Sequence, residues 1–193
     1  MFKRLYAWTI ALAESRHAPL ALAIVSFAES SFFPIPPDVM LIPMAVAQPR
    51  RAWFFAFICT LASVIGGIVG YLIGAMLYDT VGQWLIRLYG GASRIEALRE
   101  AYATWGALFI LIKGLTPIPY KLVTIVSGLL GYNFALFVFL SIITRGARFF
   151  LLAGLLNRFG EPIKAWLADH FGLFIAVLAT ALIGGIFIAT RLL

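Results

Sequence analysis

One motif occurs twice in this chain, as Pro34-Ile35-Pro36-Pro37-Asp38 and, 83 residues later (34 to 117), as Pro117-Ile118-Pro119-Tyr120-Lys121. Both copies interrupt apolar stretches, and each ends in an ionisable residue, acidic in the first copy and basic in the second. Because proline lacks a backbone donor and clashes with the preceding helical turn, neither stretch can form one continuous helix. The motif therefore predicts two broken apolar helices, and the expected helix breakers are Pro34, Pro36, Pro37, Pro117 and Pro119.

The composition around the two motifs is that of a membrane-embedded protein. Hydrophobic residues make up 63% of the 193 residues and charged residues 12%, and the mean hydropathy is +0.99. Soluble domains have about twice that share of charged residues. The net charge of +7 is assigned to membrane topology and anionic lipid, and not to nucleic acid, because the basic residues lie mostly in short loops and at helix ends.

The segment lengths predict an all-α polytopic membrane protein with one domain, residues 1–193. A spanning helix needs about 20 apolar residues, and the arms that flank each motif are shorter. Residues 19–48 could form one kinked span, but four prolines between positions 34 and 43 favour a re-entrant hairpin. The expected segments are an amphipathic N-terminal helix 1–15, hairpin 19–48, transmembrane helix 52–78, surface helices 79–104, hairpin 105–132, transmembrane helix 134–157 and transmembrane helix 171–190.

The order of these segments predicts an inverted repeat. One crossing separates the two hairpins, so that they enter the bilayer from opposite faces and their tips meet near the midplane. Paired broken helices in corresponding positions of two halves are typical of transporters whose substrate site lies between the halves. Placing the N-terminus inside assigns more Lys and Arg residues to the inner segments than to the outer ones, in agreement with the positive-inside rule.

Six ionisable residues lie at predicted membrane depth. Each would cost at least about 2.5 kcal/mol if it faced lipid, so we expect all six to face the interior. Four bases against two acids leave an excess of positive charge that suits an anionic ligand, above all a phosphate. The six residues are Glu29, Asp38, Lys113, Lys121, Arg145 and Arg148.

The bases and the acids suggest different roles. Arg145 and Arg148 are three positions apart and share one helix face, where two guanidinium groups could grip a phosphate. Together with Lys113 and Lys121 they are the candidates for binding an anionic head group, and Glu29 and Asp38 are the candidates for proton-linked gating. The alternative is structural: the acids and bases pair across the two halves and only hold the fold together.

Other kinds of site are not supported by the sequence. Cys59 is the single cysteine, which rules out an intramolecular disulfide and makes a thiol metal site very improbable. No serine lies near a histidine or another evident base, and no Gly-Lys-Ser/Thr phosphate motif or dinucleotide fingerprint occurs. We therefore expect neither an enzyme nor a cofactor or metal. Gly70 and Gly74 form a small-residue face that could pack within the monomer or against a second copy.

At this point the chain resembles the DedA family, also called the SNARE-associated Golgi or VTT-domain family. The segment from Phe27 to Asp38, FAESSFFPIPPD, is similar to the first signature of that family, and the segment from Lys113 to Lys121, KGLTPIPYK, is similar to the second. The resemblance extends from about residue 20 to 160 and is closest to the short YqaA-like branch. It implies an integral membrane protein with two opposed re-entrant hairpins.

The resemblance also implies a function and site residues. Relatives move phospholipids or the undecaprenyl phosphate carrier across a bilayer, and bacterial members depend on the proton gradient. The family's two acids match Glu29 and Asp38. Its two basic residues, usually arginines, match Lys113 and Lys121. Lysine is a compact charge without the planar fork of arginine, so bidentate phosphate binding is not expected at these two positions.

These observations predict a transporter of an anionic lipid, a lipid phosphate or a phospholipid, in the bacterial inner membrane. Its partners would be membrane lipids and protons, and a homo-oligomer is possible. Two alternatives stay open: a proton-linked exchanger of small ions or solutes that uses the same carboxylates, and a non-transporting protein that organises the membrane.

Overall fold

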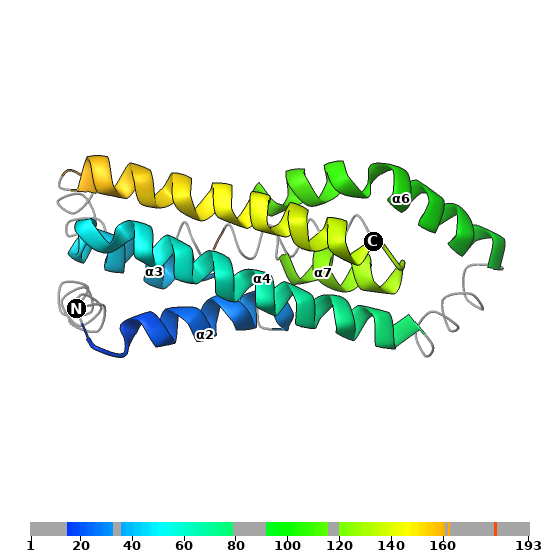
Figure 1. Ribbon diagram of the computed structural model, residues 1–193, viewed down its shortest axis with the longest axis horizontal. Coiled ribbons are helices and arrows are strands. Elements are labelled where there is room, and N and C mark those ends of the chain that lie inside the picture. The colour runs from blue at the N-terminus through cyan, green and yellow to red at the C-terminus, as the bar shows by residue number, and fades with distance from the viewer. Residues whose placement is uncertain are drawn as a thin grey trace.

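The computed structural model describes residues 15–32, 36–78, 92–115 and 120–160, together with Pro162 and Thr180, but not the side chains of 92–95 and 113–115. Apart from Ser15 and Thr180, the expected segments 1–15 and 171–190 lie outside these residues, as do the breakers Pro34, Pro117 and Pro119. Within them every regular element is helical, which confirms the all-α class (Figure 1). The helices are α2 (Ala18–Ser31), α3 (Asp38–Ala47), the 3-10 helix η1 (Pro49–Arg51), α4 (Ala52–Leu77), α6 (Ala92–Leu115), α7 (Tyr120–Leu129) and a last long helix, Phe134–Gly160.

The fold is organised around α4. α2 runs parallel to the first half of α4, since Ser26 contacts Cys59 and Ser31 contacts Gly66. α7 runs parallel to the second half, where Gly128 approaches the backbone of Tyr71. The helix Phe134–Gly160 lies antiparallel to α4 (Figure 1). Two short helices thus follow α4 in series, and their facing ends meet near its middle.

The helices α2, α3, α6 and α7 form two pairs that occupy opposite ends of the molecule. In the first helix pair, α2 runs inward and α3 runs back beside the second half of Phe134–Gly160, from the contact of Asp38 with Arg148 toward that of Pro49 with Asn157. The second helix pair, α6 and α7, enters from the other end (Figure 1). The described residues of the motifs, Pro36 to Asp38 of the first and Tyr120 and Lys121 of the second, lie at the inner ends of these two pairs.

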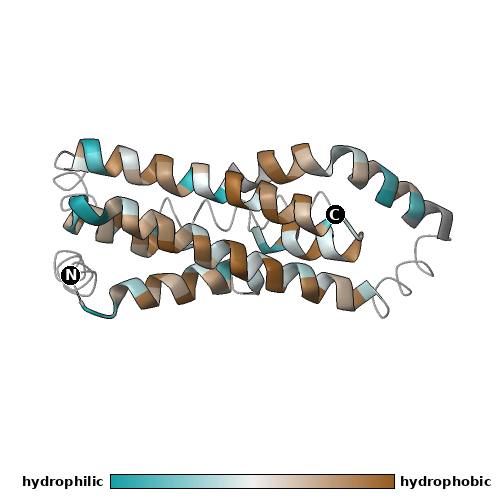
Figure 2. Ribbon diagram, viewed as in Figure 1, coloured by the Kyte–Doolittle hydropathy of each residue, from teal (hydrophilic) through white to brown (hydrophobic). Residues whose placement is uncertain are grey.

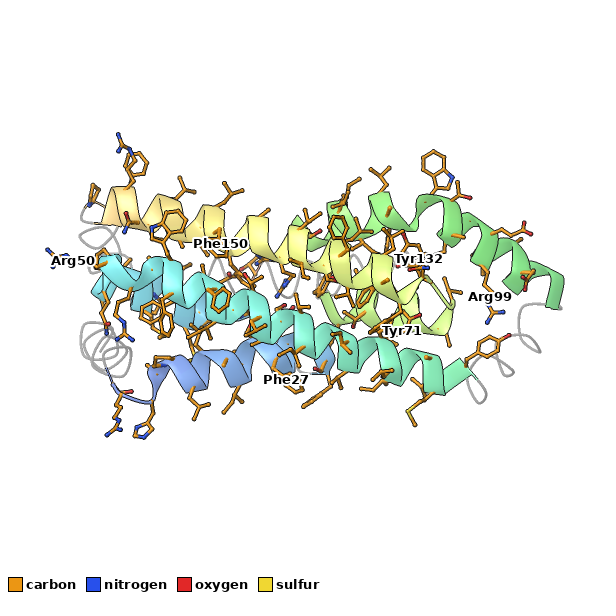
Figure 3. The ribbon with its side chains drawn as sticks, in the orientation of Figure 1. Phe27, Arg50, Tyr71, Arg99, Tyr132 and Phe150 are labelled. Carbon is orange, nitrogen blue, oxygen red and sulfur yellow. The ribbon has the colours of Figure 1, made fainter. Side chains whose placement is uncertain are left out.

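Each helix pair has its own apolar core. The first core contains residues of α2, α3, the first half of α4 and the second half of Phe134–Gly160, among them Leu22, Leu41, Phe55 and Phe149. The second contains residues of α6, α7 and the first half of Phe134–Gly160, among them Ile110, Val123 and Phe137. Phe150 packs on the first core, in the left half of Figure 3, and Tyr71 packs on the second core, which includes Tyr132, in the right half. The region between the two cores is polar and contains the candidate site.

Glycines bring α2 and α7 into backbone contact with α4. A Cβ on Gly66 would lie 2.3 Å from the carbonyl oxygen of Phe27, and one on Gly74 would lie 2.0 Å from that of Ile125. Neither position could carry a side chain without moving a neighbouring helix. The small-residue face of Gly70 and Gly74 therefore packs within the chain, against α7.

One boundary differs from the sequence-based expectation. The surface helices were expected to end at residue 104 and the second hairpin to begin at 105, but one helix continues from Ala92 to Leu115. The reason is that residues 92–105 contain neither glycine nor proline, so the polar and apolar parts can share one helix. Gly106 does not break it, because it lies in tight contact with the rings of Tyr102 and Tyr132.

The long helices are apolar on the outside, and polar residues are buried between the two apolar cores. The two longest helices, Pro49–Leu77 and Phe134–Gly160, are long and apolar enough to cross a bilayer, and most of their length is hydrophobic (Figure 2). Large hydrophobic side chains are exposed along both. They recur at helical spacing, as Trp53, Phe57, Leu61, Ile65, Leu72 and Met76 on one and Phe139, Ile143, Leu151, Leu155 and Phe159 on the other. The buried polar residues include Ser26, Glu29, Ser30, Asp38, Ser63, Thr124, Ser127, Ser141 and Arg145. This inversion of the soluble pattern is what a bilayer selects.

Candidate functional site

The centre of the site is an ion pair between the two halves of the chain. Arg145 Nη2 lies 2.6 Å from Glu29 Oε2, and the two side chains are 2% and 9% exposed. Glu29 belongs to the last turns of α2, and Arg145 lies near the middle of Phe134–Gly160. Such a buried pair is stable only if further hydrogen bonds satisfy both ions.

Two serines complete a closed ring of hydrogen bonds around this ion pair. Arg145 Nε donates to Ser63 Oγ (2.6 Å), and Ser30 Oγ donates to Glu29 Oε2 (3.1 Å). The hydroxyls of Ser30 and Ser63 are 2.6 Å apart. Because guanidinium can only donate, Ser63 accepts a hydrogen bond from Arg145 and donates one to Ser30. The ring thus joins α2, α4 and Phe134–Gly160. Two hydrogen-bond paths lead from Arg145 to Glu29, one direct and one through Ser63 and Ser30.

The backbone of α7 supplies the third contact of this carboxylate. The amide of Tyr120, the first residue of α7, donates to Glu29 Oε1 at 3.3 Å. Glu29 thereby sits at the positive end of the α7 helix dipole, a position that favours an anion. Donors from Arg145, Ser30 and Tyr120 thus converge on this one carboxylate.

Aromatic rings enclose the guanidinium of Arg145. Its Cζ lies 4.9 Å from the ring centroid of Tyr120 and 4.8 Å from that of Phe149, at cation–π distance. Tyr120 is itself fixed by a hydrogen bond between its hydroxyl and Ser141 Oγ (2.6 Å). Together with the contacts to Glu29 and Ser63, the ring contacts fix the guanidinium by residues of α2, α4 and α7.

A second ion pair lies beside the first. Arg148 Nη2 pairs with Asp38 Oδ2, and these side chains are 22% and 10% exposed, respectively. Asp38 is the first residue of α3, directly after the prolines of the first motif. Its other oxygen, Oδ1, is buried and has no hydrogen-bond partner within the described part of the chain. This second pair is therefore less completely satisfied than the first.

The two motif lysines are placed differently from the arginines. Lys121 Nζ donates to the carbonyl oxygen of Phe32 at 3.3 Å, which links the start of α7 to the end of α2. Lys113 lies in α6, and its side chain is outside the described structure. Among the described side chains, both acids pair with arginines of the last long helix and neither pairs with a motif lysine.

The site lies at mid-depth of the long helices. Ser63 is 14 residues from either end of the apolar segment Pro49–Leu77. Arg145 and Arg148 lie on either side of the midpoint of Phe134–Gly160. The polar ring is thus as far as it can be from both ends of the molecule. There, interactions between charges are strong, and a polar group without a partner is costly.

Sequence reasoning missed Ser63 and did not assign Ser30 a role in the site. The available signal was a hydroxyl in the middle of a spanning segment, Ser63, together with a second hydroxyl, Ser30, beside an intramembrane acid. Hydroxyls in membrane helices commonly bond to their own backbone, as Thr144 does. The pattern alone therefore does not identify a residue that supports the site.

Comparisons with known proteins agree with the two motifs. The model of the VTT domain matches residues 35–158. Over 165 residues the chain is 41% identical to an uncharacterised protein of Haemophilus influenzae, covering 86% of this chain and 85% of that protein. Over 165 residues it is 40% identical to an uncharacterised protein of Histophilus somni, covering 86% of each. No solved structure matches the chain. The family match, the two relatives and the apolar exterior together establish that this chain belongs to the VTT-domain (DedA) family of membrane proteins.

Proposed function

We propose that this protein is a multi-pass transporter of the bacterial inner membrane that moves an anionic lipid across the bilayer. The class of substrate is a lipid phosphate, such as undecaprenyl phosphate, or a phospholipid. The observation that carries the proposal is the pair of buried arginine–carboxylate contacts at mid-depth, where the two helix pairs meet. Charges at this depth are costly and are typical of a substrate or ion pathway.

We propose further that the two helix pairs are re-entrant and form an inverted repeat. α2 has 14 residues and α3 has 10, which correspond to about 21 Å and 15 Å of helix. Neither can cross a hydrocarbon core of about 30 Å. In the second pair, the apolar part of α6 follows Glu100, and α7 has 10 residues. The two pairs enter from opposite ends, which supports opposed entry into the bilayer (Figure 1).

The two ion pairs suggest how an anionic head group and protons could be exchanged. A phosphate offers Arg145 and Arg148 the same kind of acceptor oxygens that Glu29 and Asp38 now supply. If the carboxylates take up protons, the arginines lose their partners and become available to the phosphate. Lys121 lies beside the end of α2. Together with Lys113 it would add positive charge along the path of the head group to the arginines. This exchange would couple lipid movement to the proton gradient without an enzymatic step.

One observation favours a second candidate, a membrane-organising role without transport. The two acids and the two arginines neutralise each other, as charges that only brace the fold would do. The roles differ in one respect. Bracing requires complementary charges, whereas transport requires the arginines to face the substrate. Reversing the second pair, with Asp38→Arg and Arg148→Asp together, should restore a bracing function but not lipid movement.

The direct test is lipid translocation in proteoliposomes. It would follow labelled polyprenyl phosphate and labelled phospholipid, with and without a pH gradient, in the native protein and in Glu29→Gln and Arg145→Gln. We expect one lipid to move, faster with the gradient, and both substitutions to abolish the movement. Absence of movement of either lipid by folded protein would reject the proposal and favour a solute exchanger or the organising role.

A further inference from the structure

A second polar site lies at one end of the molecule, away from the two ion pairs. A pocket of about 460 Å³ is bounded by α6, the turn between α7 and the last long helix, and the start of that helix. Arg99 and Tyr132, which both line it, appear at this end of Figure 3. A Cβ added to Gly131 in the turn would meet nothing within 4 Å, so the turn borders open space. The volume is in the range of small-molecule sites.

The position of the pocket along the long helices corresponds to a membrane surface. Arg99 stacks over the ring of Tyr78, the residue that directly follows α4, with 4.3 Å from its Cζ to the ring centroid. The pocket also lies beside Asn133, the residue before Phe134–Gly160. It is therefore at the end of both long apolar helices, where head groups meet the protein. Leu130 and Leu136 line it as well and provide apolar contact for the start of an acyl chain.

One part of the pocket is built to bind an anion. The Asn133 side chain accepts from the amide of Leu136 (2.9 Å) and caps Phe134–Gly160, so the positive end of a 27-residue helix faces this region. Tyr132 is 5% exposed, and its hydroxyl has no partner within the described part of the chain. Arg99 Nε is likewise buried and without an acceptor there. Two donors beside a helix N-terminus call for an acceptor such as a phosphate oxygen.

The rim of the same pocket is built to bind a cation. Glu96 and Glu100 line it together with Arg99, so the described part of the lining has one positive and two negative charges. Glu96 is only loosely engaged, with its Oε2 3.8 Å from Arg99 Nη1 and its side chain 66% exposed. An excess of negative charge at the rim disfavours a purely anionic ligand and favours one with a positive group of its own.

We propose that this pocket binds the head group of a phospholipid that carries both a phosphate and an ammonium group. The phosphate interacts with Arg99, the Tyr132 hydroxyl and the start of Phe134–Gly160, and the ammonium group interacts with Glu96 and Glu100. The acyl chains leave along Leu136 toward the exposed apolar face of the long helix. This site holds α6 against the turn at residues 130–133 and does not depend on the proposed transport.

The test is lipid binding to the purified, detergent-solubilised chain, measured by native mass spectrometry. The two probes are phosphatidylethanolamine, which carries both charges, and phosphatidylglycerol, which carries only the negative one. We expect the native protein to retain phosphatidylethanolamine roughly fivefold more strongly, because the two rim carboxylates attract the ammonium group and repel a net anion. Equal retention of the two lipids overturns the proposal.

Three variants and a control localise the binding. Arg99→Gln and Tyr132→Phe should each weaken phosphatidylethanolamine binding by about tenfold, because each removes a donor to the phosphate. The double variant Glu96→Gln with Glu100→Gln should abolish the preference between the lipids. Arg51→Gln, an exposed arginine at the opposite end, should bind as the native protein does. Tyr132→Phe is nearly isosteric and removes only an unpaired hydroxyl, so it tests the site even if Arg99→Gln fails to fold. Unchanged binding in a folded Arg99→Gln or Tyr132→Phe protein overturns the proposal.

Discussion

Arg145 and Glu29 lie 2.6 Å apart although 116 residues separate them in the sequence. Their contact closes the interface between the first helix pair and the last long helix, and the amide of Tyr120 brings the second helix pair to the same carboxylate. A single carboxylate therefore connects three structural units at mid-depth. A change in its charge would change contacts in all three.

The coupling between these two charges can be measured directly. Glu29→Gln and Arg145→Gln should each lower the free energy of unfolding by about 3–5 kcal/mol, because each leaves a buried charge without its partner. The double variant should lose less than the sum, since neither charge is then left alone. The double-mutant cycle needs the free energies of unfolding of the native protein, both single variants and the double variant. All four can be measured by unfolding in mixed micelles. Strictly additive losses would mean that the two residues do not interact in the folded protein.

Ser63 is predicted to hold Arg145 in place. Ser63→Ala removes the acceptor of Arg145 Nε and leaves that buried donor without a partner, at a cost of about 1–3 kcal/mol in unfolding free energy. Thr60→Ala is the control, because it lies on the same helix and its hydroxyl bonds only to the backbone of Ala56. Thr60→Ala should lower the unfolding free energy clearly less than Ser63→Ala does. Similar losses in both variants would remove Ser63 from the supporting network.

The glycine contacts of α4 predict a strong dependence on side-chain size. In Gly74→Ala the new methyl group would lie 2.0 Å from the carbonyl oxygen of Ile125, so α7 must move. Gly146→Ala on the last long helix is the matched control, because its nearest neighbour is 3.8 Å away. We expect Gly74→Ala to lower the thermal unfolding temperature, and Gly146→Ala to leave it unchanged or raise it slightly through helix propensity. Equal behaviour would contradict the close packing of α4 and α7.

The fold was largely predictable because its causes are local. Pro36 and Pro37 interrupt a helix in any tertiary environment, and α3 begins directly after them. The lengths of the apolar segments limit which helices can span a bilayer. The continuous α6 was not predicted, because a change from polar to apolar residues was taken as a helix boundary although the backbone has no reason to break there.

The burial of three charged residues was predictable, but their partners were not. Glu29, Asp38 and Arg145 are buried, as the cost of charge in lipid requires. The choice of arginine over lysine as the partner of each acid depends on the rotation and register of Phe134–Gly160 against α2 and α3. Those are properties of packing, which a single sequence does not reveal. The role of Ser63 follows from the same register.

The proposed inverted repeat predicts which residues face each side of the membrane. Arg51 follows the first pair, and Glu100 lies on the outer part of the second, and both are exposed. With the N-terminus inside, Glu100→Cys should react with a membrane-impermeant maleimide in intact cells, and Arg51→Cys should react only after permeabilisation. The native protein is its own control, because Cys59 is fully buried in α4 and should not be labelled. Labelling of both introduced cysteines from the same side would place the two pairs on one face and would rule out the inverted repeat.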